Sequence, residues 1–404
     1  MEWFCYIALL AIIIQLTTVL LVYRNYRFNL NKYQRERSGY RPTTALCVPC
    51  KGLDSDFQKN ITSFFNQEYE NHVLYFVVED EKDPAYEQLC KLKARLCSSS
   101  KALDIKILTV GLNASGSCSQ KNYNLLGFYE NVQADFEVLA FADSDICIRN
   151  DWLSHLVYPL RQQKNGVASG YRWFVPKHNK PAELALSCLN AKVAQLLGNT
   201  RFNQVWGGSM AIRTEVFKEL KIDELWSKSI SDDLSLSFAV KKVGLKVAFV
   251  PACLGASYES TNWQKLFEFA RRQFIITRVS APKTWLIALF GTLFSILAPL
   301  ATAAIAVQAV MLGHKYSTFL IVVPFLLLAG QLMQALLRQS MIAKLLAEDH
   351  GKTKAARYAD ILFFWPLSFI MLFFILSSAF GRTIRWRGIR YQLLGPTKTI
   401  ILEN

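Results

Sequence analysis

Long apolar stretches at both ends of the chain constrain its fold more than any other feature of the sequence. Trp3–Tyr23 carries no charged side chain and has about the 20 residues that a helix needs to cross a bilayer. Three more stretches follow near the other end, at Trp285–Leu312, Thr318–Leu337 and Ile361–Phe380. The 404-residue sequence therefore predicts a soluble domain between one N-terminal and about three C-terminal membrane segments.

The charges beside these stretches predict their orientation. Glu2 precedes the first stretch. Basic residues follow it, at Arg24, Arg27, Lys32, Arg35 and Arg37. A signal peptide has the opposite order, so we expect an uncleaved anchor with its N-terminus outside and the soluble domain on the cytoplasmic face.

The basic tail Arg382–Arg390 raises a question of topology. Three full crossings after the domain would leave this tail outside, against the rule that basic flanks stay in the cytoplasm. Either Trp365 and Pro366 break the last stretch into a re-entrant or interfacial hairpin, or the first stretch folds back on itself. In both cases we expect the tail in the cytosol.

The net charge of +15 and the nine cysteines argue against two classes of protein. Much of the positive charge lies beside the membrane stretches, where anionic head groups are the natural partner, and no nucleic-acid motif accompanies it. An odd number of scattered cysteines is not typical of a disulfide-stabilised secreted domain. Cys47 and Cys50 form a CxxC with no second pair, so we interpret them as structural.

Short apolar runs separated by helical stretches predict the fold of the middle region. They lie at Thr43–Val48, Val73–Val78, Ile105–Val110 and Glu137–Ala142. This alternation predicts βαβ units and a parallel sheet that is buried on both faces. More irregular strand-like runs follow at Gly166–Val175, Val205–Arg213 and Lys246–Val250. Ligands bind at the carboxyl ends of such strands, where several polar residues lie here.

The segment FEFARRQFIITRV, at 267–279, alternates aromatic and basic residues, which predicts a helix at the membrane interface. We therefore divide the chain into four parts. They are an anchor at 1–24, an α/β domain at 42–255, an amphipathic interfacial segment at 256–283, and a membrane region with a basic tail at 284–404.

Two carboxylates, Asp143 and Asp145, follow the fourth apolar run. Hard divalent cations prefer oxygen ligands, and Mg²⁺ combines one or two carboxylates with substrate phosphates. A cation held here would neutralise charge on a departing diphosphate. The pair alone is typical of a solvated turn, but its position at a strand end in an α/β domain favours the metal site.

Asp232 and Asp233 stand at the start of a helical stretch, SDDLSLSFAV. Carboxylates in a first turn stabilise the helix, with Ser231 or Asp232 as the N-cap. The same place can hold a general base, which takes the proton from an attacking hydroxyl. The residues by themselves leave both interpretations open.

Four further residues are candidates for ligand binding. Asp80 can accept hydrogen bonds from a base or a ribose, or belong to a turn. Lys121 stands before a helix and can neutralise a phosphate, or be exposed. Gly207 and Gly208 permit a ligand to approach the backbone closely, or form a β-bulge.

In the same order along the chain, several stretches resemble the family 2 and family 21 glycosyltransferases, most closely the ceramide glucosyltransferase-like branch. The resemblance runs from about Ala45 to Arg278 and extends weakly into the tail, IRWRGIRYQLL. The matching stretches are VPCKGLD, VVEDEKDPAY, SGSCSQKNYNLL, FADSDICI, GYRWFVP, WGGSMAIR and SDDLSLS. The resemblance implies a GT-A fold, the Rossmann-like fold of nucleotide-diphospho-sugar transferases, and inversion at the anomeric carbon.

The resemblance also implies roles for individual residues. Asp80 is expected near the uridine of a UDP-sugar. Asp143 and Asp145 are expected at the diphosphate with Mg²⁺ or Mn²⁺. Asp233 is expected as the general base, with Asp232 beside it. The nucleotide and phosphate pocket is expected to include Pro49, Lys51 and Lys121.

One motif departs from the family pattern. Members usually carry (Q/R)xxRW in the amphipathic segment, and here its place is taken by Ala270–Phe274, ARRQF. Arg271, Arg272 and Gln273 are the candidates to bind diphosphate or acceptor in its place. The missing tryptophan and the small number of membrane segments disfavour a processive polysaccharide synthase.

The sequence thus predicts an inverting membrane glycosyltransferase that moves a hexose, expected to be glucose, from a UDP-sugar to a lipid such as ceramide, as in sphingolipid metabolism. We expect it in the plasma membrane of a bacterium, or in the Golgi or ER of a eukaryote. Two alternatives stay open: a processive polysaccharide synthase, and a non-catalytic membrane-associated protein that binds nucleotide-sugars.

Overall fold

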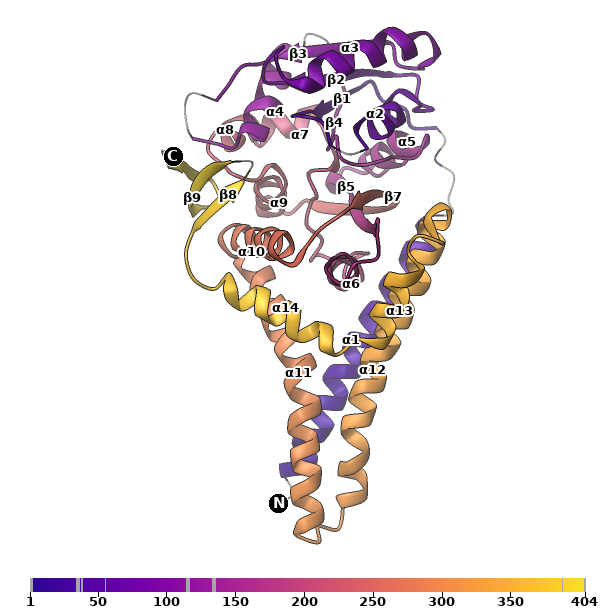
Figure 1. The fold of residues 1–404 in the computed structure, drawn as a ribbon, viewed down its shortest axis with the longest axis vertical. Coiled ribbons are helices and arrows are strands. Elements are labelled where there is room, and N and C mark those ends of the chain that lie inside the picture. The colour runs from indigo at the N-terminus through magenta and orange to yellow at the C-terminus, as the bar shows by residue number, and fades with distance from the viewer. Residues whose placement is uncertain are drawn as a thin grey trace.

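The computed structural model describes residues 3–33, 37, 39–54, 56–113, 117–132, 136–386 and 388–402. Figure 1 shows a sheet domain from which several long helices project. Arg35 and Arg387, which belong to the basic flank and the basic tail considered above, lie outside the described residues.

Seven strands form one sheet, in the order β3-β2-β1-β4-β6-β5-β7. The strands are β1 (Thr44–Pro49), β2 (His72–Val78), β3 (Asp104–Thr109), β4 (Val138–Ala142), β5 (Asn165–Pro176), β6 (Ser209–Arg213) and β7 (Lys246–Glu259). The predicted α/β fold of GT-A type is therefore confirmed. The sheet is not wholly parallel, because β6 runs antiparallel to β4 and β5.

Two strands differ in length from the predicted runs. β6 covers only the second half of the run 205–213, because a turn precedes it in which Ser209 N–H donates to the carbonyl of Trp206, at 3.1 Å. β7 continues to Glu259, beyond residue 255 where the domain was expected to end, because it pairs with β5 as far as Pro176.

Helices cover both faces of this sheet, because alternate strand residues point to opposite sides. On β1, Leu46 and Val48 pack with one set of helices, whereas Ala45 and Cys47 pack with the other. The first set is α2 (Phe57–Phe65), α3 (Pro84–Leu96) and α5 (Trp152–Val157). The second set is α4 (Gln120–Asn131), α7 (Thr214–Glu219), α8 (Ile222–Trp226) and α9 (Asp232–Lys242). The nine cysteines all lie among the described residues and none forms a disulfide, and Cys47 and Cys50 are buried in these cores.

Within the part of the chain that the structure describes, three helices are long and apolar enough to cross a membrane. They are α1 (Trp3–Tyr33), α11 (Pro282–Met311) and α12 (Ser317–Leu345), which project together from the sheet domain (Figure 1). α1 is longer than the predicted anchor because its last turns contact the domain. There, the side chains of Asn25 and Asn29 donate to the carbonyls of Gln195 and Leu197, at 3.1 and 3.3 Å.

The last apolar stretch forms a bent pair of helices instead of one straight span. α13 (Lys354–Leu362) and α14 (Pro366–Ser377) meet at 91°. Pro366 has no N–H for a continuing helix and disfavours helical backbone in the residue before it. Lys192, on α6 (Pro181–Ala194), stabilises the break by donating to the carbonyl of Phe364 at 2.9 Å and to the hydroxyl of Ser368 at 3.0 Å.

The tail returns to the sheet domain after α14. It forms a small antiparallel sheet of β8 (Thr383–Trp386), β9 (Ile389–Gly395) and β10 (Lys398–Leu402). Tyr391 and Leu393 pack against Ile230, before α9, and Ile275, on α10 (Trp263–Ser280). The tail thus lies on the same side of the membrane helices as the sheet domain, and Figure 1 shows the two termini far apart.

Candidate active site

The carboxyl ends of β2, β1 and β4 lie side by side at one edge of the sheet, because these strands are neighbours and parallel. Pro49 ends β1, Glu79 and Asp80 follow β2, and Asp143 follows β4. Acids and bases that are far apart in the sequence are therefore gathered at this edge.

Lys121 joins two of the predicted carboxylates. It lies in the first turn of α4, which begins after the N-cap Ser119. Its ammonium is 2.6 Å from Asp143 Oδ1 and 3.1 Å from Asp232 Oδ2. Burial alone would lower the pKa of Lys121, but the carboxylates of Asp143 and Asp232 outweigh burial and raise that pKa above its ordinary value. Lys121 therefore carries its positive charge at neutral pH.

Arg172, on β5, pairs with both members of the predicted metal site. Its guanidinium lies 3.1 Å from Asp143 Oδ2 and 3.2 Å from Asp145 Oδ1. It also lies over the rings of Phe174 and Trp206, at 5.2 and 5.1 Å from the ring centres. Sequence reasoning gave Arg172 no role. The signal that would have found it is a single arginine in an apolar strand, since buried charges are almost always paired.

Asp232 and Asp233 open α9, where Ser231 is the N-cap and accepts the N–H of Leu234 at 3.1 Å. Asp232 is 4% exposed, and burial raises its pKa to about 6. Asp233 is partly exposed, and its Oδ2 accepts the N–H of Gly207 at 3.1 Å. Asp233 is therefore the more accessible of the two carboxylates, and Ser231 is the N-cap.

These contacts define a carboxylate cluster, which consists of Asp143, Asp145, Asp232 and Asp233 with the cations Lys121 and Arg172. Asp233 belongs to it because its charge also raises the pKa of Lys121. Four carboxylates face two cations, so the cluster is negative when all are ionised. A negative cluster at the sheet edge attracts a further cation.

The cluster fits a divalent cation that is bound together with a substrate. Asp143 and Asp145 offer oxygen ligands, and their side chains are 21% and 28% exposed. Among the residues that the structure describes, no group of three or more histidine, cysteine or acidic side chains is arranged to hold a metal. Because Mg²⁺ typically takes one or two carboxylates, water and substrate phosphates, two carboxylates suffice.

Gly207 and Gly208 lie in the turn before β6, where the backbone passes close to side chains of the site. A Cβ on Gly207 would collide with the carboxylate of Asp232, and one on Gly208 would collide with the ring of Trp206. The absence of a Cβ at these two glycines therefore leaves room for the side chains of Asp232 and Trp206. The sequence analysis had considered only a ligand or a β-bulge.

We expect Gly207→Ala to reduce kcat/KM at least tenfold for the transferase activity that the sequence resemblance predicts, about the effect of 1.4 kcal/mol. The added methyl group would push the carboxylate of Asp232 away from Lys121. The control is Gly291→Ala on α11, where a Cβ meets no atom within 4 Å. Steady-state assays of both variants test this, and equal activities would contradict it.

The expected nucleotide residues lie at the ends of β1 and β2. Lys51 forms an ion pair with Glu79. Asp80 is exposed, and its Oδ1 accepts the N–H of Lys82 at 2.8 Å, which closes a turn. The structure thus brings Pro49, Lys51 and Asp80 to the edge that holds the carboxylate cluster, and a role in binding uridine stays a prediction.

Tyr391, in the tail sheet, is a further candidate that sequence reasoning missed. Its side chain is 2% exposed and accepts a hydrogen bond from the backbone N–H of Gln120, the residue before Lys121. Burial raises the pKa of the Tyr391 phenol, and the charge of Glu79 contributes to the increase. The tail therefore packs against the start of α4. The weak family resemblance of the tail stretch IRWRGIRYQLL was the feature of the sequence that could have indicated Tyr391.

The amphipathic helix α10 connects the domain to the tail and to α14. Arg272 lies over the rings of Phe269 and Trp386, at 5.6 and 5.8 Å. Arg271 Nε donates to the carbonyl of Ser377, at the end of α14, at 3.1 Å. Gln273 lies on the same helix. The expected roles of Arg272 and Gln273 in diphosphate binding stay predictions.

Comparison with known proteins identifies a family. The model of Glycosyl transferase family 21 matches residues 3–399. Among solved structures, a mannosyltransferase, PcManGT from Pyrobaculum calidifontis in complex with GDP-Man and Mn²⁺, is 13% identical, covers 93% of this chain and 97% of its own, and has a TM-score of 0.44. GalNAc-T7 with UDP, GalNAc and Mn²⁺ is 12% identical over 59% of this chain and 51% of its own, with a TM-score of 0.38. Both structures are too distant to indicate what this chain binds.

Proposed function

We propose, since this chain belongs to glycosyltransferase family 21, that it transfers a hexose from a UDP-sugar to a membrane lipid with inversion at the anomeric carbon. The observation that carries the proposal is the carboxylate cluster, in which two cations hold acids from β4 and α9 at the carboxyl edge of the sheet. Three candidate membrane helices project from the same domain, so a lipid acceptor is within reach of its membrane side. From the sequence resemblance, we take glucose as the hexose and ceramide as the acceptor.

In the proposed reaction, Asp233 accepts the proton of the acceptor hydroxyl while that oxygen bonds to the anomeric carbon. The bond from this carbon to UDP breaks, and its electron pair leaves with the diphosphate. Asp143 and Asp145 would hold a divalent cation, Mg²⁺ or Mn²⁺, which would supply positive charge beside the diphosphate as it departs.

The cations of the cluster have a positioning role in this proposal. Lys121 orients Asp143 and Asp232, and Arg172 orients Asp143 and Asp145. Because each cation is shared between two carboxylates, the acids are held in one arrangement before substrate arrives.

The test is an assay of the purified full chain in detergent with UDP-glucose, ceramide and Mg²⁺ or Mn²⁺. We expect UDP release and a glycosylated lipid, identified by mass spectrometry, only when all three are present. Removal of the cation with EDTA should abolish transfer, and excess Mn²⁺ should restore it. Long polymer from UDP-glucose without lipid would instead indicate a polysaccharide synthase. UDP binding without transfer to any lipid of a broad panel would indicate a binding protein.

A further inference from the structure

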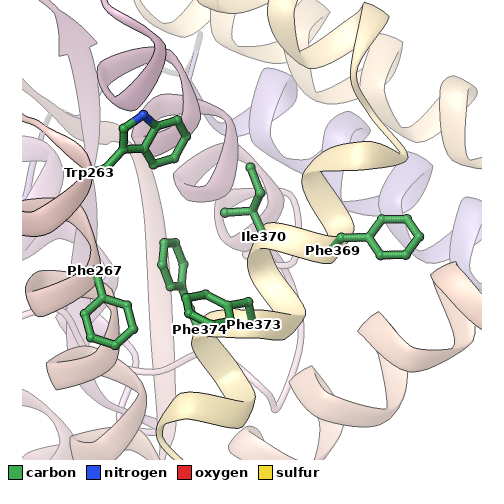
Figure 2. Close-up of a pocket in the computed structure, with 6 residues that line it drawn as sticks. All are labelled: Trp263, Phe267, Phe369, Ile370, Phe373 and Phe374. Atoms are coloured by element: carbon green, nitrogen blue, oxygen red, sulfur yellow. The ribbon is translucent and has the colours of Figure 1, made fainter.

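An aromatic groove lies between α10 and α14, with a cavity volume of about 690 Å³. We call it the α10–α14 groove. Figure 2 shows the side chains that line it, which are Trp263 and Phe267 of α10 and Phe369, Ile370, Phe373 and Phe374 of α14. All six are apolar or aromatic, so the groove suits a hydrocarbon ligand and offers little to a sugar or a phosphate.

The groove lies where the membrane helices join the domain. α10 leads directly into α11, and α14 packs against α11 through the cluster that includes Trp285 and Met371. Figure 1 shows α14 crossing between the sheet domain and the long helices. Trp263 and Phe373 are 50% and 60% exposed. Exposed aromatic surface of this kind is unfavourable in water, and the adjacent bilayer supplies the hydrocarbon that covers it.

A layer of aromatic side chains joins this groove to the carboxylate cluster. Phe374, in the groove wall, is 3% exposed and belongs to the same packed cluster as Phe174. The guanidinium of Arg172 lies over the ring of Phe174 and forms an ion pair with Asp145. Phe174 also meets Phe269 of α10 edge to face, with ring centres 5.6 Å apart. One packed cluster of side chains therefore joins the groove to Phe174, which contacts Arg172 of the predicted reaction centre.

We propose that the α10–α14 groove binds an acyl chain of the lipid acceptor and so positions its hydroxyl at the carboxylate cluster. This inference rests on the proposed function and adds the place where the lipid is held. The apolar lining excludes the head group, which stays on the side of Arg172. The acyl chain enters from the bilayer along α14, so the lipid does not need to leave the membrane completely.

The first test fills the groove by Ile370→Trp. We expect KM for stearoyl ceramide to rise about tenfold, because the acyl chain loses most of its buried apolar contact. KM for hexanoyl ceramide and for UDP-glucose should change less than about twofold, since a short chain depends little on the groove. The matched control is Phe325→Ala on α12, a side chain that is 68% exposed on a candidate membrane span outside the groove.

A second measurement does not depend on turnover. A ceramide with a photoactivatable diazirine at the end of its acyl chain is irradiated with the full chain in vesicles. Peptides that contain Phe369–Phe374 should be labelled, and the label should be lost in Ile370→Trp but kept in Phe325→Ala.

Labelling confined to α11 or α12, or equal KM changes for the long-chain and short-chain ceramides, would overturn the groove assignment. Failure of the proposed function has a different signature, because the wild-type protein would then glycosylate neither ceramide while the labelling result still decides the groove.

Discussion

Asp233→Asn is expected to lower kcat for lipid glycosylation by about 10³-fold and to change UDP affinity by less than about twofold. The substitution keeps the shape of the side chain but removes the group that takes the proton from the acceptor hydroxyl. Because the proposed base acts on the acceptor, the donor site should be intact. The measurements are single-turnover transfer to ceramide and calorimetric titration with UDP.

The matched control is Asp223→Asn, at the start of α8, because Asp223 is also a partly exposed acid in a first helical turn. It should behave like the wild type. Normal turnover of Asp233→Asn would refute the assignment of the base. If Asp232→Asn alone removed turnover, the base would be Asp232, whose pKa of about 6 would then have to be seen in the pH profile of kcat.

Lys121→Met is expected to abolish transfer and also to destabilise the domain, by about 3 kcal/mol. The side chain of Lys121 is 18% exposed, and its ammonium is shared between Asp143 and Asp232. Removing it leaves the buried carboxylate of Asp232 without its cation. Thermal unfolding in detergent and the transfer assay measure the two effects separately.

The double variant Lys121→Met/Asp232→Asn separates stability from catalysis. Neutralising Asp232 removes the unpaired buried charge, so much of the lost Tm should return while transfer stays absent. If the double variant also recovered transfer, Lys121 would act only by neutralising Asp232. If the single variant kept its Tm, the shared ion pairs would not hold the site together.

The core fold and the membrane segments could be predicted because they depend on local patterns. A run such as Val73–Val78 is apolar throughout, since a strand in the middle of a covered sheet is buried on both faces, and the structure has β2 at 72–78. A span such as Trp285–Leu312 is recognised by its length and its lack of charge, and α11 occupies it. The strand ends then indicated Asp143 and Asp145, because the carboxyl edge of a parallel sheet collects polar residues.

The partners of those acids could not be predicted in the same way. Arg172 lies on β5 and reaches Asp143 and Asp145 only because β5 joins the sheet on the far side of the antiparallel strand β6. Tyr391 follows all the membrane helices in the chain, and it meets Gln120 only because the bend between α13 and α14 turns the tail back. No local pattern encodes contacts between residues so distant in the chain.

The sequence by itself determined the α/β domain, three of the four predicted membrane segments and the acids at the strand ends, because hydrophobic periodicity and segment length act over a few residues. Only the tertiary structure decided that Lys121 and Arg172 hold these acids together, that the last apolar stretch bends, and that α10 and α14 enclose an apolar groove. The physical reason is that ion pairs and grooves form between elements that the chain brings together from distant positions. Their geometry depends on strand order and helix packing, which no single segment specifies.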